Sequence, residues 1–120
     1  MDTTYTSEYK QKLTTPQKAV EMIVYGDTVI PGMSFAEPPA LLKAIADRVR
    51  GEELKDIKFY FMNPTSHAAE SVLAPDLADC IQVYSLFVGS SDRAMVKVGL
   101  SYFVPNYFHQ IPRLVHFPIM

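Results

Sequence analysis

The 120-residue sequence has one cysteine, Cys80, and no tryptophan. A single cysteine excludes an internal disulfide, and we expect an unreactive, buried thiol in a reducing compartment. The histidines are also few, and His67, His109 and His116 lie far apart, with no carboxylate or thiol at metal-ligand spacing. The sequence therefore predicts no metal site.

An excess of charge and a long apolar run are absent as well. The formal net charge is −2, and the 11 lysines and arginines are scattered along the chain, so no basic stripe is available to bind nucleic acid. No run approaches the roughly 20 apolar residues that span a bilayer, and the polar residues 1–13 do not form a signal peptide. We therefore expect a cytoplasmic protein that binds neither nucleic acid nor membrane.

Short apolar runs and helical periodicities do occur, and they alternate along the chain. A first helix is expected from Thr14 or Thr15 to Gly26, and the clearest helix begins at Pro38 or Pro39 and ends at Gly51. This alternation predicts an α/β fold, a mostly parallel sheet with crossover helices in one small domain. Further helices are expected near 67–73, 90–98 and 106–115, and strands at 28–30, 58–62, 80–88 and 102–104.

The strand expected at 80–88 is apolar at nearly every position from Val83 onward. Such a run is typical of a strand whose two faces are both covered. The residues at 116–120, HFPIM, are apolar too, and they carry no capping or solubilising side chain. We interpret this ending as an interruption of a longer domain.

The loop after the first expected strand is the candidate site. In an α/β protein, a strand followed by a glycine turn and a helix start builds a ligand crevice. Pro38 and Pro39 remove backbone donors, and neither a Walker nor a Rossmann glycine pattern is present, so phosphate binding is disfavoured. The loop is either a plain strand-to-helix turn or the lining of a crevice for an uncharged or carboxylate-bearing group. The candidate substrate-binding residues are Gly32, Met33, Ser34, Phe35 and Glu37.

Two residues of this loop invite more specific roles. Glu37 could act as a nucleophile or base, but a structural interaction with a helix N-terminus is the favoured interpretation. Gly32 is expected to turn the chain with a backbone conformation that other residues avoid, whereas Ser34 is expected to tolerate alanine.

Several short motifs follow one another along residues 9–115: Tyr9-x-x-Lys12-Leu13-Thr14-Thr15, Gly26-Asp27-x-Val29, Glu37-Pro38-x-x-Leu41-Leu42, Phe87-Val88-Gly89, Arg93, Gly99, Tyr102-x-Val104-Pro105 and Gln110-Ile111-Pro112-Arg113-Leu114. In this order they resemble the acetyl-CoA hydrolase/transferase family, which includes 4-hydroxybutyrate, butyrate, acetate and succinate CoA-transferases. The last of these motifs departs from the family, which usually has a glutamate where this chain has Gln110.

The resemblance implies a function that this chain would share with a longer protein. Members of the family have two similar α/β domains and move CoA between an acyl-CoA and a carboxylic acid, through a glutamyl-CoA intermediate on a glutamate of the second domain. No glutamate here matches that residue, so the resemblance assigns no catalytic residue to this chain. It implies that residues 1–120 are part of the N-terminal domain and that the loop from Gly32 to Glu37 borders the acyl or pantetheine cleft. Phe87, Gly89 and Arg93 would shape the domain.

Three functions stay open at this point. The first is the N-terminal portion of a CoA-transferase, inactive alone, with coenzyme A as a substrate and no separate cofactor. The second is a noncatalytic remnant or interaction module of the same fold. The third is an acyl-CoA hydrolase, in which water accepts the acyl group. In each case we expect self-association or binding of the missing C-terminal portion, because parallel sheets need covered faces and edges.

Overall fold

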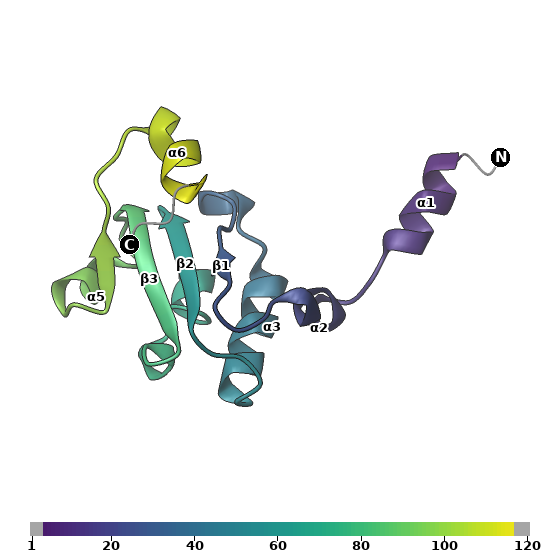
Figure 1. The fold of residues 1–120 in the computed structure, drawn as a ribbon, viewed down its shortest axis with the longest axis horizontal. Coiled ribbons are helices and arrows are strands. Elements are labelled where there is room, and N and C mark those ends of the chain that lie inside the picture. The colour runs from purple at the N-terminus through teal and green to yellow at the C-terminus, as the bar shows by residue number, and fades with distance from the viewer. Residues whose placement is uncertain (1–3, 117–120) are drawn as a thin grey trace.

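The structure is a computed structural model, and it describes residues 4–116 (Figure 1). Its helices alternate with its strands from β1 onward, as the sequence predicts. In order, the elements are α1 Thr4–Lys12, α2 Pro16–Ala19, the 3-10 helix η1 Val20–Met22, β1 Thr28–Val29, η2 Ser34–Ala36, α3 Pro39–Arg50, β2 Ile57–Met62, α4 Ser66–Ala69, η3 Pro75–Leu77, β3 Ile81–Phe87, α5 Arg93–Lys97, β4 Ser101–Phe103, η4 Phe108–Gln110 and α6 Ile111–His116.

The four strands form one sheet in the order β1-β2-β3-β4, and every neighbouring pair is parallel. Parallel neighbours require crossovers, and α3, α4 and α5 lie in the three connections. The carboxyl ends of the strands therefore meet at one edge of the sheet. The predicted α/β fold with a mostly parallel sheet is confirmed.

One face of the sheet packs against helices and forms the core. Phe59 and Phe61 of β2 are fully buried, and their rings stack with centroids 5.3 Å apart. They belong to one apolar cluster with Leu42 and Ile45 of α3 and with Met95 of α5. Alternate residues of a strand point to opposite faces, so this cluster uses only half of the strand positions.

The other face of the sheet carries a row of tyrosines. Tyr60, Tyr84 and Tyr102 are in register on β2, β3 and β4. Ring centroids are 4.8 Å apart for the first pair and 5.6 Å for the second. Exposure rises along the row, from 7% for Tyr60 to 58% for Tyr102. The expectation that both faces of the third strand are covered is met only in part: from Val83 onward, Tyr84 is half-buried and Leu86 is buried, but Phe87 is exposed.

The N-terminal part differs from the expectation as well. The polar residues 1–13 show no clear periodicity, yet Thr4–Lys12 is a helix with no buried residue, and it stands away from the sheet (Figure 1). The helix expected up to Gly26 ends earlier, as α2 and then η1. Thr15 caps it as predicted, because its hydroxyl accepts a hydrogen bond from the Lys18 amide.

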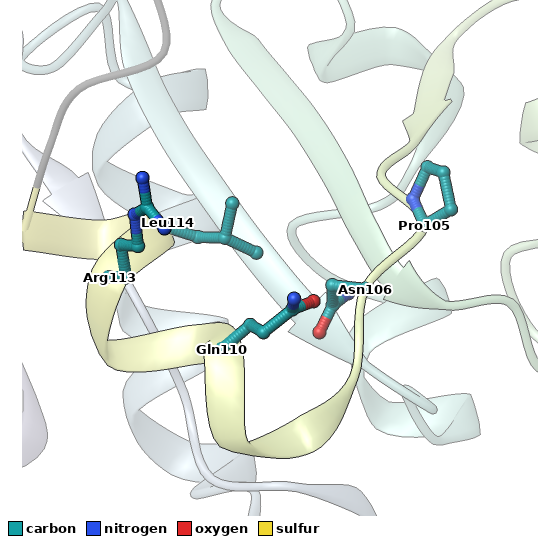
Figure 2. A pocket seen from close by; sticks show the side chains of 5 residues that line it. All are labelled: Pro105, Asn106, Gln110, Arg113 and Leu114. Atoms are coloured by element: carbon teal, nitrogen blue, oxygen red, sulfur yellow. The ribbon is translucent and has the colours of Figure 1, made fainter.

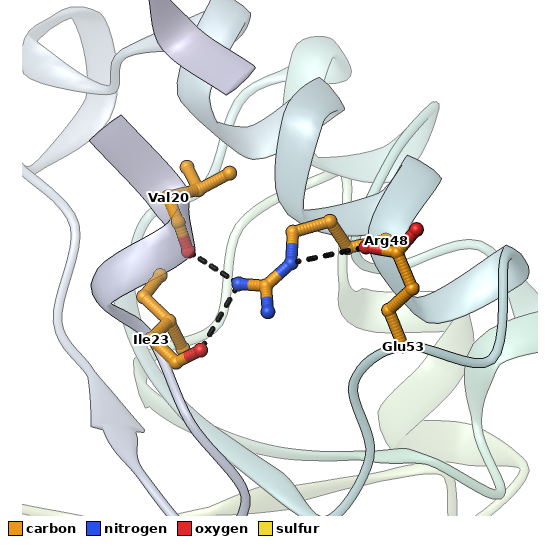
Figure 3. A network of polar contacts seen from close by, with 4 residues as sticks. All are labelled: Val20, Ile23, Arg48 and Glu53. Atoms are coloured by element: carbon orange, nitrogen blue, oxygen red, sulfur yellow. Dashed lines mark hydrogen bonds and ion pairs between the residues drawn. The ribbon is translucent and has the colours of Figure 1, made fainter. Parts of the chain in front are cut away.

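Arg48 fastens this short helical segment to α3 (Figure 3). Its Nη1 donates to the carbonyl oxygens of Val20 and Ile23, the second at 3.0 Å. Its Nε lies 3.7 Å from a carboxylate oxygen of Glu53. The guanidinium thus satisfies carbonyls at the end of a helix, where intrahelical partners are lacking.

Several other elements are shorter than expected. The helix expected over 90–98 is α5, and the residue before it is Asp92 instead of Ser90 or Ser91. The helix expected over 106–115 splits into η4 and α6, with Pro112 in the first turn of α6. Within residues 4–116, no helix is long and apolar enough to cross a membrane. Most of the apolar ending, residues 117–120, lies outside the described part of the chain.

Candidate substrate cleft

Three loops leave the carboxyl ends of β1, β2 and β3, and hydrogen bonds join them to one another. Ser34, in the first loop, donates from Oγ to the backbone oxygen of Asn63 at 3.2 Å. Asn63, in the second loop, returns a hydrogen bond from Nδ2 to the same Ser34 Oγ at 2.9 Å. Both residues have a positive φ, 49° for Ser34 and 52° for Asn63. The reciprocal bonds hold two backbone conformations that non-glycine residues seldom adopt.

Two glycines allow the loops to approach this closely. A Cβ at Gly32 would lie 2.4 Å from the carbonyl oxygen of Ala36, so the loop folds back tightly on itself. A Cβ at Gly89 would lie 2.4 Å from Oδ1 of Asn63, so the third loop touches the second. The expectation that Gly32 adopts a positive φ is wrong, because Ser34 takes that conformation instead. A glycine is needed at position 32 because the Ala36 carbonyl approaches the backbone too closely to leave room for a Cβ.

Glu37 ties the first loop to the second a few residues further on. Its side chain is 5% exposed, and Oε2 accepts hydrogen bonds from the Thr65 hydroxyl at 2.7 Å and the Thr65 amide at 3.2 Å. Thr65 precedes α4, so the carboxylate lies at the N-terminus of α4 and not at that of α3. The favoured interpretation of Glu37 was an interaction with a helix N-terminus, and the structure agrees with it. The helix is α4, however, and not α3, which follows Glu37 directly in the sequence.

The outer side of the same loop is apolar. Phe35 is completely exposed and Met33 is half exposed, although the neighbouring Ser34 and Glu37 are fixed by hydrogen bonds. Phe35 borders a hollow of about 240 Å³. The lining residues of this hollow are Ser34, Phe35, Glu37, Pro39, Thr65, Ser66 and His67.

A buried carboxylate shapes the third loop. Asp92 has no exposed surface, and its oxygens accept hydrogen bonds from the Gly89 amide at 2.7 Å and the Ser85 hydroxyl at 2.5 Å. A buried charge is tolerated only when such partners are present. Asp92 therefore fixes the turn that brings Gly89 against Asn63.

A larger cavity, of about 470 Å³, lies further along the same edge of the sheet, between the end of β4 and α6 (Figure 2). Its lining residues are Pro105, Asn106, Gln110, Arg113 and Leu114. The backbone connects it to the loops described above, because the Leu86 oxygen accepts from Asn106 and the adjacent Phe87 oxygen accepts from the Asn63 amide.

The structure places the predicted site residues unevenly. Ser34, Phe35 and Glu37 line the hollow near Thr65, Met33 is exposed beside it, and Gly32 supports the loop from within. Sequence reasoning missed four polar or small residues of the neighbouring loops. Each lies within three residues of the end of a strand, and that position at the carboxyl end of a parallel strand was the available signal. The missed residues are Asn63, Thr65, Gly89 and Asn106.

Within residues 4–116, no group of three or more histidine, cysteine or acidic side chains is arranged to hold a metal ion. Cys80 is half-buried and free, on the rim of the core cluster. The expectation of a buried thiol is therefore met only in part.

Comparison with known proteins identifies the family. The sequence matches the acetyl-CoA hydrolase/transferase N-terminal domain over residues 1–120. The chain belongs to this family. The resemblance seen in the short motifs is confirmed.

Two curated members of the family are similar along almost the whole chain. The succinyl-CoA:cyclohexane-1-carboxylate CoA transferase of Geobacter metallireducens is 33% identical over 111 residues, which are 92% of this chain and 24% of that protein. The butyryl-CoA:acetate CoA-transferase of Anaerostipes caccae is 31% identical over 111 residues, 90% of this chain and 24% of that protein. This chain thus spans about a quarter of the length of these relatives.

Solved structures agree with the fold. RipA from Yersinia pestis is 38% identical with a TM-score of 0.85, over 93% of this chain and 28% of RipA. A solved variant of RipA gives a TM-score of 0.87 at 37% identity, over 93% of this chain and 27% of the variant.

Proposed function

We propose that this chain forms the first part of the N-terminal domain of a cytoplasmic CoA-transferase. The enzyme would move CoA between an acyl-CoA and a small carboxylic acid, with coenzyme A as substrate and no further cofactor. Family membership supports CoA chemistry, and the named reactions of both curated relatives are CoA transfers.

The observation that carries the assignment of roles is the environment of Glu37. It is the glutamate of the predicted cleft, yet it is buried and bonded to Thr65, so it is not free to attack a thioester. We therefore place the nucleophilic glutamate outside this chain. The three joined loops serve as one wall of the cleft, and Met33 and Phe35 present an apolar surface to the substrate.

The proposed reaction proceeds through covalent intermediates. A glutamate carboxylate attacks the thioester carbonyl, which gives an acyl-glutamyl anhydride and releases the CoA thiolate. The thiolate then attacks the glutamyl carbonyl and releases the first carboxylate, which leaves a glutamyl-CoA thioester. A second carboxylate then attacks the glutamyl-CoA thioester, which gives a new anhydride and releases the CoA thiolate. The thiolate attacks the acyl carbonyl of this anhydride, so that the new acyl-CoA leaves and the glutamate carboxylate is regenerated.

A chimera tests this proposal. Residues 1–120 would replace the matching N-terminal segment of the Anaerostipes caccae butyryl-CoA:acetate enzyme, and CoA exchange would be followed with butyryl-CoA and acetate. We expect exchange and a CoA adduct, detected by mass spectrometry, in the chimera, and neither in residues 1–120 alone. The variant Glu37→Gln in the chimera should keep the adduct, because a glutamine oxygen can still accept from Thr65.

Three results would contradict the proposal. Turnover by residues 1–120 alone that Glu37→Gln abolishes would make Glu37 the nucleophile. A folded chimera that forms no adduct would favour a noncatalytic interaction module. If water instead of acetate accepted the butyryl group, the enzyme would be a hydrolase.

We also propose that the uncovered tyrosine face and the unpaired edges of the sheet take part in self-association or in binding the remainder of the protein. The support is the exposure of Tyr102 and Phe103 on β4, an outer strand of the sheet.

A further inference from the structure

The cavity beside α6 contains two side-chain amides that face each other from neighbouring turns (Figure 2). Asn106 follows β4, and Gln110 ends η4. Pro105 and Leu114 supply apolar walls, while Arg113 points away from the two amides (Figure 2). At about 470 Å³, the cavity is within the usual size range of small-molecule sites.

The orientation of the Asn106 amide is fixed by its donors. Nδ2 donates to the Val104 oxygen at 2.8 Å and to the Leu86 oxygen at 3.2 Å. Rotation by 180° would set Oδ1 against two carbonyl oxygens, so the reverse assignment is excluded. Oδ1 is buried and has no hydrogen-bond partner among the described residues. A buried acceptor without a partner calls for a donor that the described chain does not provide.

The Gln110 amide is held through its oxygen, whereas the Asn106 amide is held through its nitrogen. Its Oε1 accepts a hydrogen bond from the Tyr107 amide at 3.0 Å, as part of a capping box around η4. Nε2 is therefore the free end, and no hydrogen bond from it to the described part of the chain is found. One side of the cavity thus offers an acceptor, and the other offers a donor.

We propose that this cavity binds a secondary amide of the pantetheine arm of CoA. The amide N–H would donate to Asn106 Oδ1, the amide carbonyl would accept from Gln110 Nε2, and the flanking methylene groups would contact Pro105 and Leu114. A trans amide carries its donor and acceptor on opposite sides, which matches two groups that face each other across a cavity. The inference rests on the proposed function, because it takes CoA as the substrate.

The carboxylic acid substrate fits the cavity less well. A carboxylate has no proton to donate to Asn106 Oδ1, and its negative charge would lie next to that oxygen. A water molecule could satisfy both amides. Water would not, however, make binding depend on an amide in the ligand, and this difference decides the experiment.

The test compares pantetheine with an analogue in which ester oxygens replace both amide N–H groups. Binding would be measured by calorimetry, and the side-chain amide resonances of Asn106 and Gln110 would be followed by NMR, in residues 1–120 and in the chimera. We expect pantetheine to bind about fivefold more tightly than the ester, as for one net hydrogen bond. We also expect pantetheine to shift both amide resonances.

The variant Gln110→Ala should weaken pantetheine binding by a similar factor, whereas Gln11→Ala, on the exposed helix α1, should not change it. Equal affinities for pantetheine and the ester, or unchanged Asn106 and Gln110 resonances at saturation, would overturn the inference. CoA exchange in the chimera is scored separately. Exchange without an amide preference rejects only this site, and an amide preference without exchange rejects only the enzymatic proposal.

Discussion

The two faces of the sheet differ sharply, although the same strands form both. The face with Phe59 and Phe61 is closed by α3, α4 and α5 into one apolar cluster. The face with Tyr60, Tyr84 and Tyr102 is open at β4, and α6, which has no buried residue, leaves a cavity beside it. We infer that the first face provides the stability of the fold, and that the second is available for a ligand or for another part of a larger protein.

The largest expected effect comes from the closed face. Phe59→Ala should lower the free energy of unfolding by about 3–5 kcal/mol, because it leaves a cavity in a fully buried position. Tyr102→Ala, on the open face, should cost less than about 1 kcal/mol, because that side chain is already 58% exposed. Urea unfolding of the two variants measures the difference. Equal losses would show that the open face is covered in solution, for example by a second copy of the chain.

A smaller effect is expected where Arg48 joins α2 and η1 to α3. Arg48→Ala should cost about 2 kcal/mol, because the carbonyls of Val20 and Ile23 lose a charged donor. Arg50→Ala on the same helix is the control, since its ion pair with Asp76 lies at the surface and should contribute little. Thermal unfolding compares them. A larger loss for Arg50→Ala would contradict the view that Arg48 fastens the N-terminal segment to the core.

The smallest expected effect concerns pH and the open face. Burial, together with the nearby Tyr84, raises the pKa of Tyr60 above its ordinary value. The folded state therefore favours the neutral phenol. This contribution to stability is complete below the ordinary pKa of about 10 and is lost as the pH rises through the higher pKa of the folded state.

Tyr60→Phe should reduce the loss of stability above about pH 10, whereas Tyr25→Phe, at a side chain that is 66% exposed, should leave it unchanged. Urea unfolding at a series of alkaline pH values provides the comparison. An identical pH dependence in all three proteins would show that Tyr60 is not shielded from solvent.

Much of the closed face could be predicted from the sequence. The apolar residues of α3 recur at helical spacing, and Pro39 and Gly51 mark its ends, so its bounds were nearly correct. Such local signals do not depend on partners far away in the chain. The helix at Thr4–Lys12 was missed because its sequence is polar on all sides and carries no such periodicity.

The candidate cleft could be predicted only in part. The loop after β1 stood out because glycine and two prolines interrupt an apolar pattern. The hydrogen-bond partners of this loop, Asn63 and Thr65, did not stand out in the sequence. They become recognisable as partners only when β2 is placed beside β1. The hydrogen bonds of Ser34 and Glu37 each span 28 or 29 residues, a separation that no local pattern encodes.

The reciprocal bonds between Ser34 and Asn63 have a consequence for binding. A loop that is disordered in the free protein must lose conformational entropy each time a ligand arrives, and this loss weakens the affinity. Here the two left-handed residues are already held in place without a ligand, so that ordering happens once, during folding. In the proposed cleft, Phe35 would therefore contact the substrate from a backbone that is already ordered, and more of the area it buries there would contribute to affinity.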